Sequence, residues 1–215
     1  ITGLEFSPDF LFIKERSSTG SPLVFDIIRG TGKALQTRAT TTEYSIAETV
    51  TSFDSNGFGV DYDGSSSSIV TNRSNETYVA WAWDAGDDAN PVSNTDGTIT
   101  SQVRANTSAG FSIVTASPGG AATIGHGLNA APEFIMCKSR NNTYNWAIYH
   151  SALGKDKTLK LNSTDAEQSV SGFWGSSEPT SSVFGVGSGS STNNTGDMVY
   201  YCFAPVAGYS EFGSY

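Results

Sequence analysis

The sequence has few of the residues that carry most enzyme chemistry, and few positive charges. Its 215 residues include two histidines and two cysteines, and charged residues make up only 15% of the chain. Lysine and arginine total 12 and stand singly, whereas aspartate and glutamate total 21, so the formal net charge is −9. An acidic chain without a basic cluster is a poor match for a phosphate backbone. We therefore expect no nucleic-acid partner.

Long apolar runs are also missing. No run approaches the roughly 18 residues that a membrane-spanning helix needs, so we expect no membrane span. The hydrophobic share is 37%, and serine, threonine, asparagine and glycine fill much of the rest. Aromatic residues nevertheless reach 12% and lie in short alternating runs, which argues against a disordered chain. This composition is typical of an extracellular β protein with long polar loops, and we expect the chain to be extracellular or on a virion surface.

Neither histidine lies in a setting that predicts catalysis. His126 precedes a predicted strand and His150 ends one, and neither has a serine or cysteine nucleophile motif beside it. No pair of carboxylates stands out as the two acids of a glycosidase. We predict that the protein is not an enzyme and needs no cofactor. The weak exception is calcium, for which Asp61 and Asp63 stand in an acidic loop that lacks the closing glutamate of an EF-hand.

What the sequence does contain is an internal repeat. Residues 127–140 follow the order of residues 3–16, 124 positions earlier: glycine, leucine, proline, an acid, an apolar run, lysine and arginine. Two later matches keep the same order at offsets of 126 and 120, residues 58–60 with 184–186 and residues 78–83 with 198–203. Drifting offsets are what loop insertions and deletions produce. The sequence therefore predicts two homologous units.

Many short apolar or alternating runs, separated by polar turns, predict an all-β fold. We expect two tandem homologous β-sandwich domains of the jelly-roll or concanavalin-like type, and no helix longer than about two turns. The expected division is a first sandwich over 1–86, a linker over 87–97, a second sandwich over 98–208 and a C-terminal strand over 209–215.

The two predicted units differ at their leading edge. Predicted strands over 98–103 and 111–115 precede the second repeat, and the first repeat has nothing in that position. The C-terminal segment looks like a displaced leading strand, with residues 212–215 standing where 111–114 stand before the second repeat. A missing strand leaves an exposed sheet edge or a groove in the core.

Two explanations for this asymmetry are open. In the first, Tyr209, Phe212 and Tyr215 of one subunit belong to an assembly strand that completes the first unit of the next subunit. Repetition of that contact builds an open head-to-tail homopolymer, so the main partner of the protein is the protein itself. In the second, the chain is a segment of a longer array whose covalent neighbours supply the strands.

The cysteines and the aromatic residues each have two interpretations. Cys137 and Cys202 lie in apolar runs, either as two small core residues or as a disulfide between neighbouring strands. Most strand aromatics have a counterpart of similar size in the other repeat, which favours core packing. Trp174 has no such counterpart, and we single it out, with Tyr144, as a candidate contact for cell-surface carbohydrate.

Six sequons for N-linked glycosylation lie in predicted loops or at strand ends, where a glycan fits. In a chain this rich in asparagine, serine and threonine, many sequons arise by chance. The candidate attachment sites are Asn72, Asn75, Asn106, Asn141, Asn162 and Asn193.

Several motifs resemble those of one known family. They are Gly110-Phe111-Ser112-Ile113-Val114-Thr115, Ile124-Gly125-His126-Gly127-Leu128, Trp146-Ala147-Ile148-Tyr149-His150 and Tyr201-Cys202-Phe203-Ala204. With residues 81–86 and 208–215, they resemble the tandem β domains of unassigned function in tail-fibre and other structural proteins of marine and freshwater bacteriophages, including cyanophages. The resemblance spans nearly the whole chain. It implies a concanavalin-like or jelly-roll sandwich with a structural or adhesive role, and it supplies no catalytic residues.

The repeat, the asymmetry and this resemblance together predict a structural subunit of an extracellular or virion fibre, assembled head-to-tail by β-strand addition. The alternative is a carbohydrate-binding, adhesive module of a phage tail fibre. Deletion of residues 209–215 separates the two, because it removes assembly in the first case and leaves sugar binding intact in the second.

Overall fold

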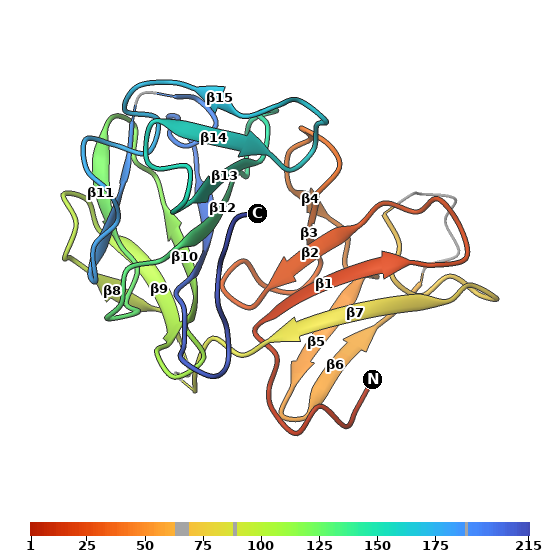
Figure 1. Cartoon of the computed structure of the whole chain (residues 1–215). Coiled ribbons are helices and arrows are strands. Elements are labelled where there is room, and N and C mark those ends of the chain that lie inside the picture. The colour runs from red at the N-terminus through yellow and green to blue at the C-terminus, as the bar shows by residue number, and fades with distance from the viewer. Residues whose placement is uncertain (63–68, 88–89, 188) are drawn as a thin grey trace. The chain divides into compact units, whose positions relative to one another are not determined.

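The computed structural model describes residues 1–62, 69–87, 90–187 and 189–215. All regular structure in these residues is β, in 17 strands that form antiparallel sheets, an arrangement consistent with a β-sandwich (Figure 1). The all-β prediction is therefore confirmed. The chain divides into two compact units, which we call unit 1 (Ile1–Asp84) and unit 2 (Ala85–Tyr215). The described residues form no helix of the length and apolarity that crossing a membrane requires.

Unit 1 contains a five-stranded antiparallel sheet with the order β4-β3-β2-β1-β7 and a two-stranded sheet of β5 and β6. Its strands are β1 (Phe10–Glu15), β2 (Leu23–Asp26), β3 (Lys33–Gln36), β4 (Tyr44–Ser45), β5 (Val50–Asp54), β6 (Gly57–Val60) and β7 (Tyr78–Trp83). Alternate residues of the larger sheet, such as Leu11, Ile13 and Phe25, face the core. There they pack with Val50 and Phe58 of the smaller sheet, so the two sheets enclose one hydrophobic core.

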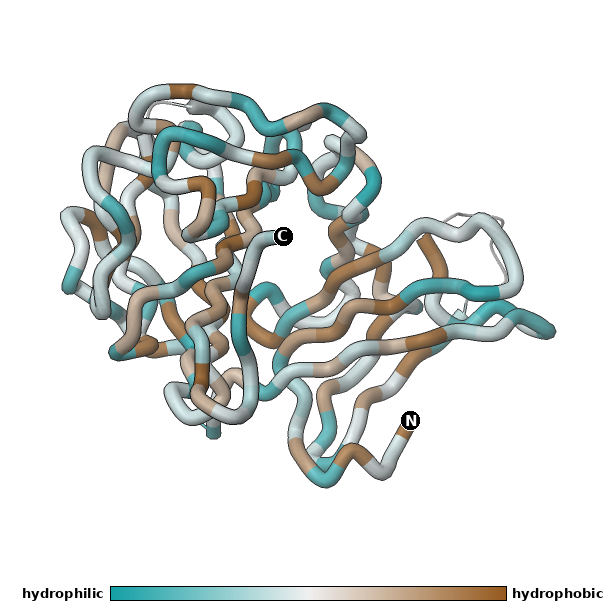
Figure 2. The backbone as a smooth tube through the Cα atoms, viewed as in Figure 1, coloured by the Kyte–Doolittle hydropathy of each residue, from teal (hydrophilic) through white to brown (hydrophobic). Residues whose placement is uncertain are grey.

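Unit 2 contains an eight-stranded antiparallel sheet with the order β15-β14-β13-β12-β17-β10-β9-β8 and a two-stranded sheet of β11 and β16. Its strands are β8 (Val92–Asn94), β9 (Ser101–Asn106), β10 (Phe111–Ala116), β11 (Ala122–Gly125), β12 (Phe134–Ser139), β13 (Ala147–His150), β14 (Lys157–Lys160), β15 (Gln168–Ser169), β16 (Val183–Val186) and β17 (Met198–Phe203). Ile124 and Phe184 of the smaller sheet pack with Cys137 and Tyr200 of the larger one. In both units apolar residues concentrate along the strands and polar residues along the connecting loops (Figure 2).

The larger sheets of the two units correspond in strand order and in register. The order β4-β3-β2-β1-β7 in unit 1 matches β15-β14-β13-β12-β17 in unit 2. Phe10 at the start of β1 lies opposite Trp83 of β7, and Phe134 at the start of β12 lies opposite Phe203 of β17. The internal repeat aligns these same residues with one another.

Left-handed backbone conformations recur at the spacing of the repeat. Gly3 and Gly127 have φ angles of 98° and 72°, and Glu5 and Asn129 have φ angles of 61° and 58°. Residues with a Cβ rarely adopt a positive φ, so its recurrence at Glu5 and Asn129 is specific. The repeated sequence is thus accompanied by a repeated backbone path ahead of β1 and β12.

One segment differs from the division expected from the sequence. The expected linker over 87–97 contains β8, which pairs with β9 and belongs to the larger sheet of unit 2. This strand was missed because its three residues include one apolar side chain, that of Val92. The strand expected over 209–215 would form with another subunit or a further repeat, and it stays a prediction. The C-terminal segment forms one isolated bridge, between Val206 and Ser210, and residues 211–215 have no regular structure.

Candidate functional site

The open edge of β7 is the clearest difference between the larger sheets of the two units (Figure 1). β17 pairs with β12 on one side and with β10 on the other, whereas among the described strands β7 pairs with β1 alone. Five of the six residues of β17 are buried, and none of those of β7 is. No described strand of unit 1 covers the outer side of β7. Its backbone N–H and C=O groups on that side are therefore placed to pair with another strand.

A groove of about 390 Å³ lies beside this edge in unit 1. Ala80 and Ala82, whose side chains point from β7 toward the core, form one wall. Most of the remaining wall is apolar and comes from β1, β6 and the N-terminal segment: Ile1, Leu4, Ile13, Phe58 and Val60. A groove of this kind suits an added strand, which buries alternate side chains in it while its backbone pairs with β7.

The groove exists because unit 1 lacks bulk at positions that unit 2 fills. Ala80 stands where β17 has Tyr200, and Ala82 stands where β17 has Cys202. In unit 2, β10 also adds Val114 to the core, opposite Tyr200. No described strand of unit 1 takes the place of β10. The core of unit 1 consequently ends at a hollow beside β7.

Two polar side chains in the groove wall differ in how they are satisfied. The Tyr78 phenol oxygen accepts a hydrogen bond from the backbone N–H of Arg73 at 3.0 Å. Burial raises the pKa of Tyr78, so this phenol is neutral at physiological pH. The Thr71 Oγ1 is buried and has no hydrogen-bond partner among the described residues. A buried hydroxyl group without a partner costs about 1–3 kcal/mol, so Thr71 adds an unsatisfied polar group to the groove wall, next to the exposed side chain of Asn72.

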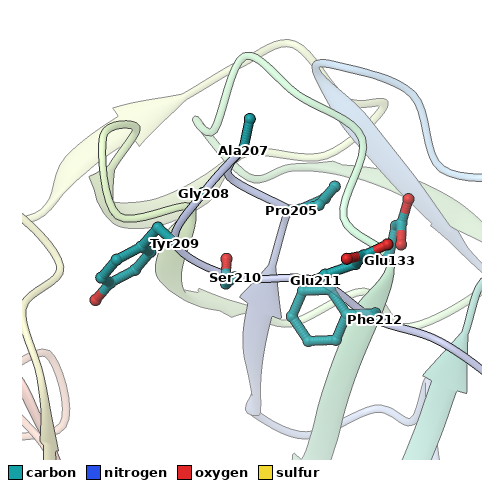
Figure 3. Close-up of a pocket in the computed structure, with 8 residues that line it drawn as sticks. All are labelled: Glu133, Pro205, Ala207, Gly208, Tyr209, Ser210, Glu211 and Phe212. Carbon is teal, nitrogen blue, oxygen red and sulfur yellow. The ribbon is translucent and has the colours of Figure 1, made fainter.

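The C-terminal segment forms a second hollow, within unit 2. Residues 205–212, except Val206, and Glu133 line an open space of about 740 Å³. The side chains of Glu133, Glu211 and Phe212 gather at one end of it, and Tyr209 points away (Figure 3). The hollow is wide open and carries two carboxylates, and we regard it as a consequence of how the segment folds back on unit 2.

The three predicted assembly residues have different surroundings in the single chain. The ring of Phe212 stacks on that of Phe134, with ring centroids 6.0 Å apart and an interplanar angle of 3°. Tyr209 is 72% exposed and Tyr215 is fully exposed. Phe212 is thus held by its own unit, whereas the two tyrosines are accessible to another molecule.

The structure corrects the expectation that Trp174 contacts sugars. Trp174 is 1% exposed and packs in the core of unit 2, with its ring 5.8 Å from that of Tyr149 in an edge-to-face arrangement. A ring enclosed in a core offers no face on which a sugar can stack. The absence of a counterpart in unit 1 reflects the larger core of unit 2. Tyr144 is 36% exposed and keeps an accessible ring.

The accessible tryptophan is Trp81 of β7, for which the sequence favoured core packing. Its side chain is 47% exposed and lies beside Phe12, with ring centroids 5.4 Å apart. The counterpart of Trp81 in unit 2, Tyr201, is fully buried. Similar size at matching positions therefore did not mean similar burial, because the two sheets are not covered in the same way.

The two cysteines are free thiols in the core of unit 2, so the core interpretation holds and the disulfide does not form. The pairing of β12 with β17 sets Cys137 opposite Tyr200 and Cys202 opposite Ile135. The cysteines are therefore diagonal neighbours on adjacent strands. Burial raises the pKa of both thiols, which keeps them protonated.

The six sequons differ in accessibility. Asn72, Asn75 and Asn141 are exposed, as attachment of a glycan requires. The side chains of Asn106 and Asn162 are partly buried and hydrogen-bonded within the chain. Asn193 is 5% exposed and its Nδ2 donates to the carbonyl oxygen of Gly187. The expectation for Asn193 is thus corrected, because the nitrogen that would carry the glycan is enclosed.

The remaining candidates are the aspartates of the acidic loop and the histidines. Asp61 is exposed, and Asp63 lies outside the described residues. The residues that the structure describes include no group of three or more histidine, cysteine, aspartate or glutamate side chains able to hold a metal ion. His126 is buried, its Nε2 lies 3.1 Å from the carbonyl oxygen of Thr180, and burial lowers its pKa. This histidine is a neutral structural residue.

Comparison with known proteins identifies a family. No curated protein and no solved structure matches the chain. A family model described as a domain of unknown function, DUF7483, matches residues 1–215 and so covers both units. The chain therefore belongs to the DUF7483 family.

Proposed function

We propose that the protein is a structural subunit of an extracellular or virion fibre, assembled head-to-tail by β-strand addition between successive subunits. The observation that carries this proposal is the open edge of β7 beside an apolar groove, where the corresponding strand β17 is paired on both sides. Natural sheets seldom leave such an edge uncovered, because it is a template for another strand. A strand from a second subunit would pair with this edge and fill the groove.

Within this proposal, the two units are tandem homologous copies of one jelly-roll or concanavalin-like sandwich. The matching strand order, the matching register and the shared positive φ of Glu5 and Asn129 support it. If the copies are equivalent, unit 1 lacks the strand that corresponds to β10. This strand would run antiparallel to β7, on the side away from β1. The C-terminal segment, whose residues 212–215 resemble the start of β10, is the proposed donor.

The proposed contact generates a fibre because donor and acceptor lie on different units. Each subunit in a chain of contacts gives its C-terminal segment to one neighbour and receives that of another. A heterologous contact of this kind forms an open polymer unless its rotation closes a ring. Backbone hydrogen bonds, worth about 0.5–1.5 kcal/mol each net, and the burial of apolar side chains in the groove would supply the affinity.

Donation of the C-terminal segment to another subunit costs free energy, because Phe212 must leave its place in unit 2. The stack of Phe212 on Phe134 is lost when the segment extends, and aromatic pairs of this kind are worth about 0.5–1.5 kcal/mol beyond area burial. This cost is comparable to one backbone hydrogen bond and is offset once several form along β7. Assembly is therefore expected to depend on protein concentration rather than on a separate activating step.

The test compares the full chain with a chain that ends at Ala207. Sedimentation velocity and electron microscopy should show fibres for the full chain and folded monomers for the shorter one. A full chain carrying Tyr144→Ala, which removes an exposed tyrosine from another part of unit 2, is the matched control and should form fibres. The proposal is wrong if the full chain stays monomeric up to about 1 mM, where an association of about −4 kcal/mol is still visible.

One observation favours a second candidate, a carbohydrate-binding module of a phage tail fibre. Trp81 and Phe12 present adjacent aromatic rings on the face of the unit 1 sheet, and Trp81 is 47% exposed. Exposed tryptophan rings stack on sugars through their faces. Titration of cell-surface glycans against tryptophan fluorescence tests this, since Trp81→Ala should remove binding, and Tyr144→Ala tests the exposed tyrosine of unit 2 separately. Absence of binding to a broad glycan panel contradicts it.

A further inference from the structure

The groove of unit 1 has a shape and a polar group that select one kind of side chain. We infer that it is a socket for the side chain of Tyr215 from a second copy of the chain, whose hydroxyl group pairs with the Thr71 hydroxyl. This assignment rests on the proposed function, because it takes strand addition at β7 as its starting point. It adds the register of the added strand and the residue that anchors it.

The pairing of β10 with β17 supplies the register. Val114 of β10 lies opposite Tyr200 of β17, and both side chains belong to the core of unit 2. Phe111 lies opposite Phe203, and their rings meet with centroids 4.8 Å apart. Because side chains alternate along a strand, Phe111 and Phe203 lie on the face of the sheet that points away from this core.

Transfer of this register to unit 1 aligns the C-terminal segment with β7. The repeat relates Tyr200 to Ala80, and residues 212–215 stand where 111–114 stand. Tyr215 of the second copy therefore lies opposite Ala80, and its Gly213 lies opposite Ala82. Both positions face the groove, since Ala80 and Ala82 line it.

The sizes of the paired side chains agree with this register. In unit 2 the large member of the pair, Tyr200, is on β17 and the smaller one, Val114, is on β10. In unit 1 the small member, Ala80, is on β7, so the large member belongs on the added strand. A tyrosine at position 215 restores a large and a small side chain at this place in the core, with their strands exchanged.

The hydroxyl group explains why a tyrosine suits the socket better than a phenylalanine. A buried tyrosine needs a hydrogen-bond partner, and in unit 2 the Tyr200 hydroxyl donates to the carbonyl oxygen of Thr192 at 2.9 Å. In the groove of unit 1, the Thr71 side chain is 3% exposed and its Oγ1 lacks a partner among the described residues. A hydrogen bond between the Tyr215 and Thr71 hydroxyl groups satisfies both at once.

The first test measures the association constant of full-length variants by sedimentation at several concentrations. Tyr215→Ala should weaken association about 30-fold, through loss of a buried aromatic side chain. Tyr215→Phe and Thr71→Val should each weaken it about 5-fold, and the double variant no more than either alone, because both remove one hydrogen bond. Tyr144→Ala, an exposed tyrosine outside the contact, should have no effect.

The second test fixes the register by cross-linking and does not depend on affinity. A chain with Gly213→Cys and Ala82→Cys should form disulfide-linked multimers on oxidation, because the inferred register sets these positions opposite each other. The matched chain with Gly213→Cys and Ala80→Cys, displaced by two residues, should cross-link poorly. The natural cysteines are buried and do not contribute.

The outcomes separate this inference from the proposed function. If the wild-type chain associates and Tyr215→Ala does not change its association constant, the assignment of Tyr215 to the groove is wrong, but strand addition is not contradicted. Efficient cross-linking of the displaced pair in place of the aligned pair also overturns the inferred register. A wild-type chain that never associates refutes both the proposed function and the socket.

Discussion

Replacement of Thr71 by valine should stabilise the unassembled protein. The Thr71 hydroxyl is buried in the groove wall of unit 1 without a hydrogen-bond partner among the described residues. Valine has nearly the same shape and no polar atom, so Thr71→Val removes an unsatisfied group and leaves the packing in place. Substitutions of buried polar residues usually destabilise a protein, which makes the direction of this effect diagnostic.

The expected gain follows from the cost of an unsatisfied buried hydroxyl group, about 1–3 kcal/mol. The groove opens toward solvent beside β7, so we expect the lower part of this range, about 1 kcal/mol. With a urea dependence of about 1–2 kcal/mol per molar for a unit of this size, the midpoint of unfolding of unit 1 rises by about 0.5–1 M. The chain that ends at Ala207 is the appropriate background, because assembly cannot then mask the effect.

Thr49→Val is the matched control for this measurement. Thr49 also belongs to unit 1 and is 1% exposed, but its Oγ1 donates to the carbonyl oxygen of Ile46 at 2.8 Å. Loss of this bond should lower the free energy of unfolding by about 1 kcal/mol. A destabilising Thr71→Val, of the same sign as Thr49→Val, would show that the Thr71 hydroxyl is satisfied in the free protein.

Three further predictions concern other parts of the chain. Glu5 has a φ of 61°, so Glu5→Gly should raise the free energy of unfolding by about 1 kcal/mol in urea denaturation, and an unchanged or lower value would contradict the strain. Burial lowers the pKa of Lys138 to about 8, so the unfolded chain binds more protons between about pH 8 and 10 and stability should rise with pH in that window. Lys138→Met should remove this rise, and its persistence would assign it to another group. Cys137 and Cys202 should resist a thiol reagent in the native protein and react after unfolding, whereas rapid native labelling would contradict their burial.

The features that depend on local sequence were predictable. The runs that form β1 and β12 are recognisable by apolar residues between a proline and a charged end, and the asparagine-glycine pair at residues 56–57 marks the turn between β5 and β6. The internal repeat predicted the correspondence of the two larger sheets. It also indicated an open edge, because none of the described residues ahead of β1 forms a strand that matches β9 or β10.

The features that depend on distant neighbours were not predictable. Trp174 is enclosed and Trp81 is exposed because of what lies over each ring, which neither side chain reveals in the sequence. The groove comes from small residues on β7 combined with the lack of a neighbouring strand among the described residues, and the unsatisfied Thr71 hydroxyl depends on how distant parts of the chain pack around it. A residue-by-residue comparison of β7 with β17 could have indicated the groove, because alanine at position 80 aligns with tyrosine at position 200.

Hydrogen exchange along β7 tests strand addition most directly. The amides of residues 78–83 that face away from β1 have no described strand to pair with inside unit 1, and they gain hydrogen bonds only if another strand joins the edge. With strand addition, these amides become protected in the assembled full chain and stay unprotected in the chain that ends at Ala207. Equal exchange at β7 in assembled and unassembled protein would contradict it, because the subunits would then be joined through some other surface.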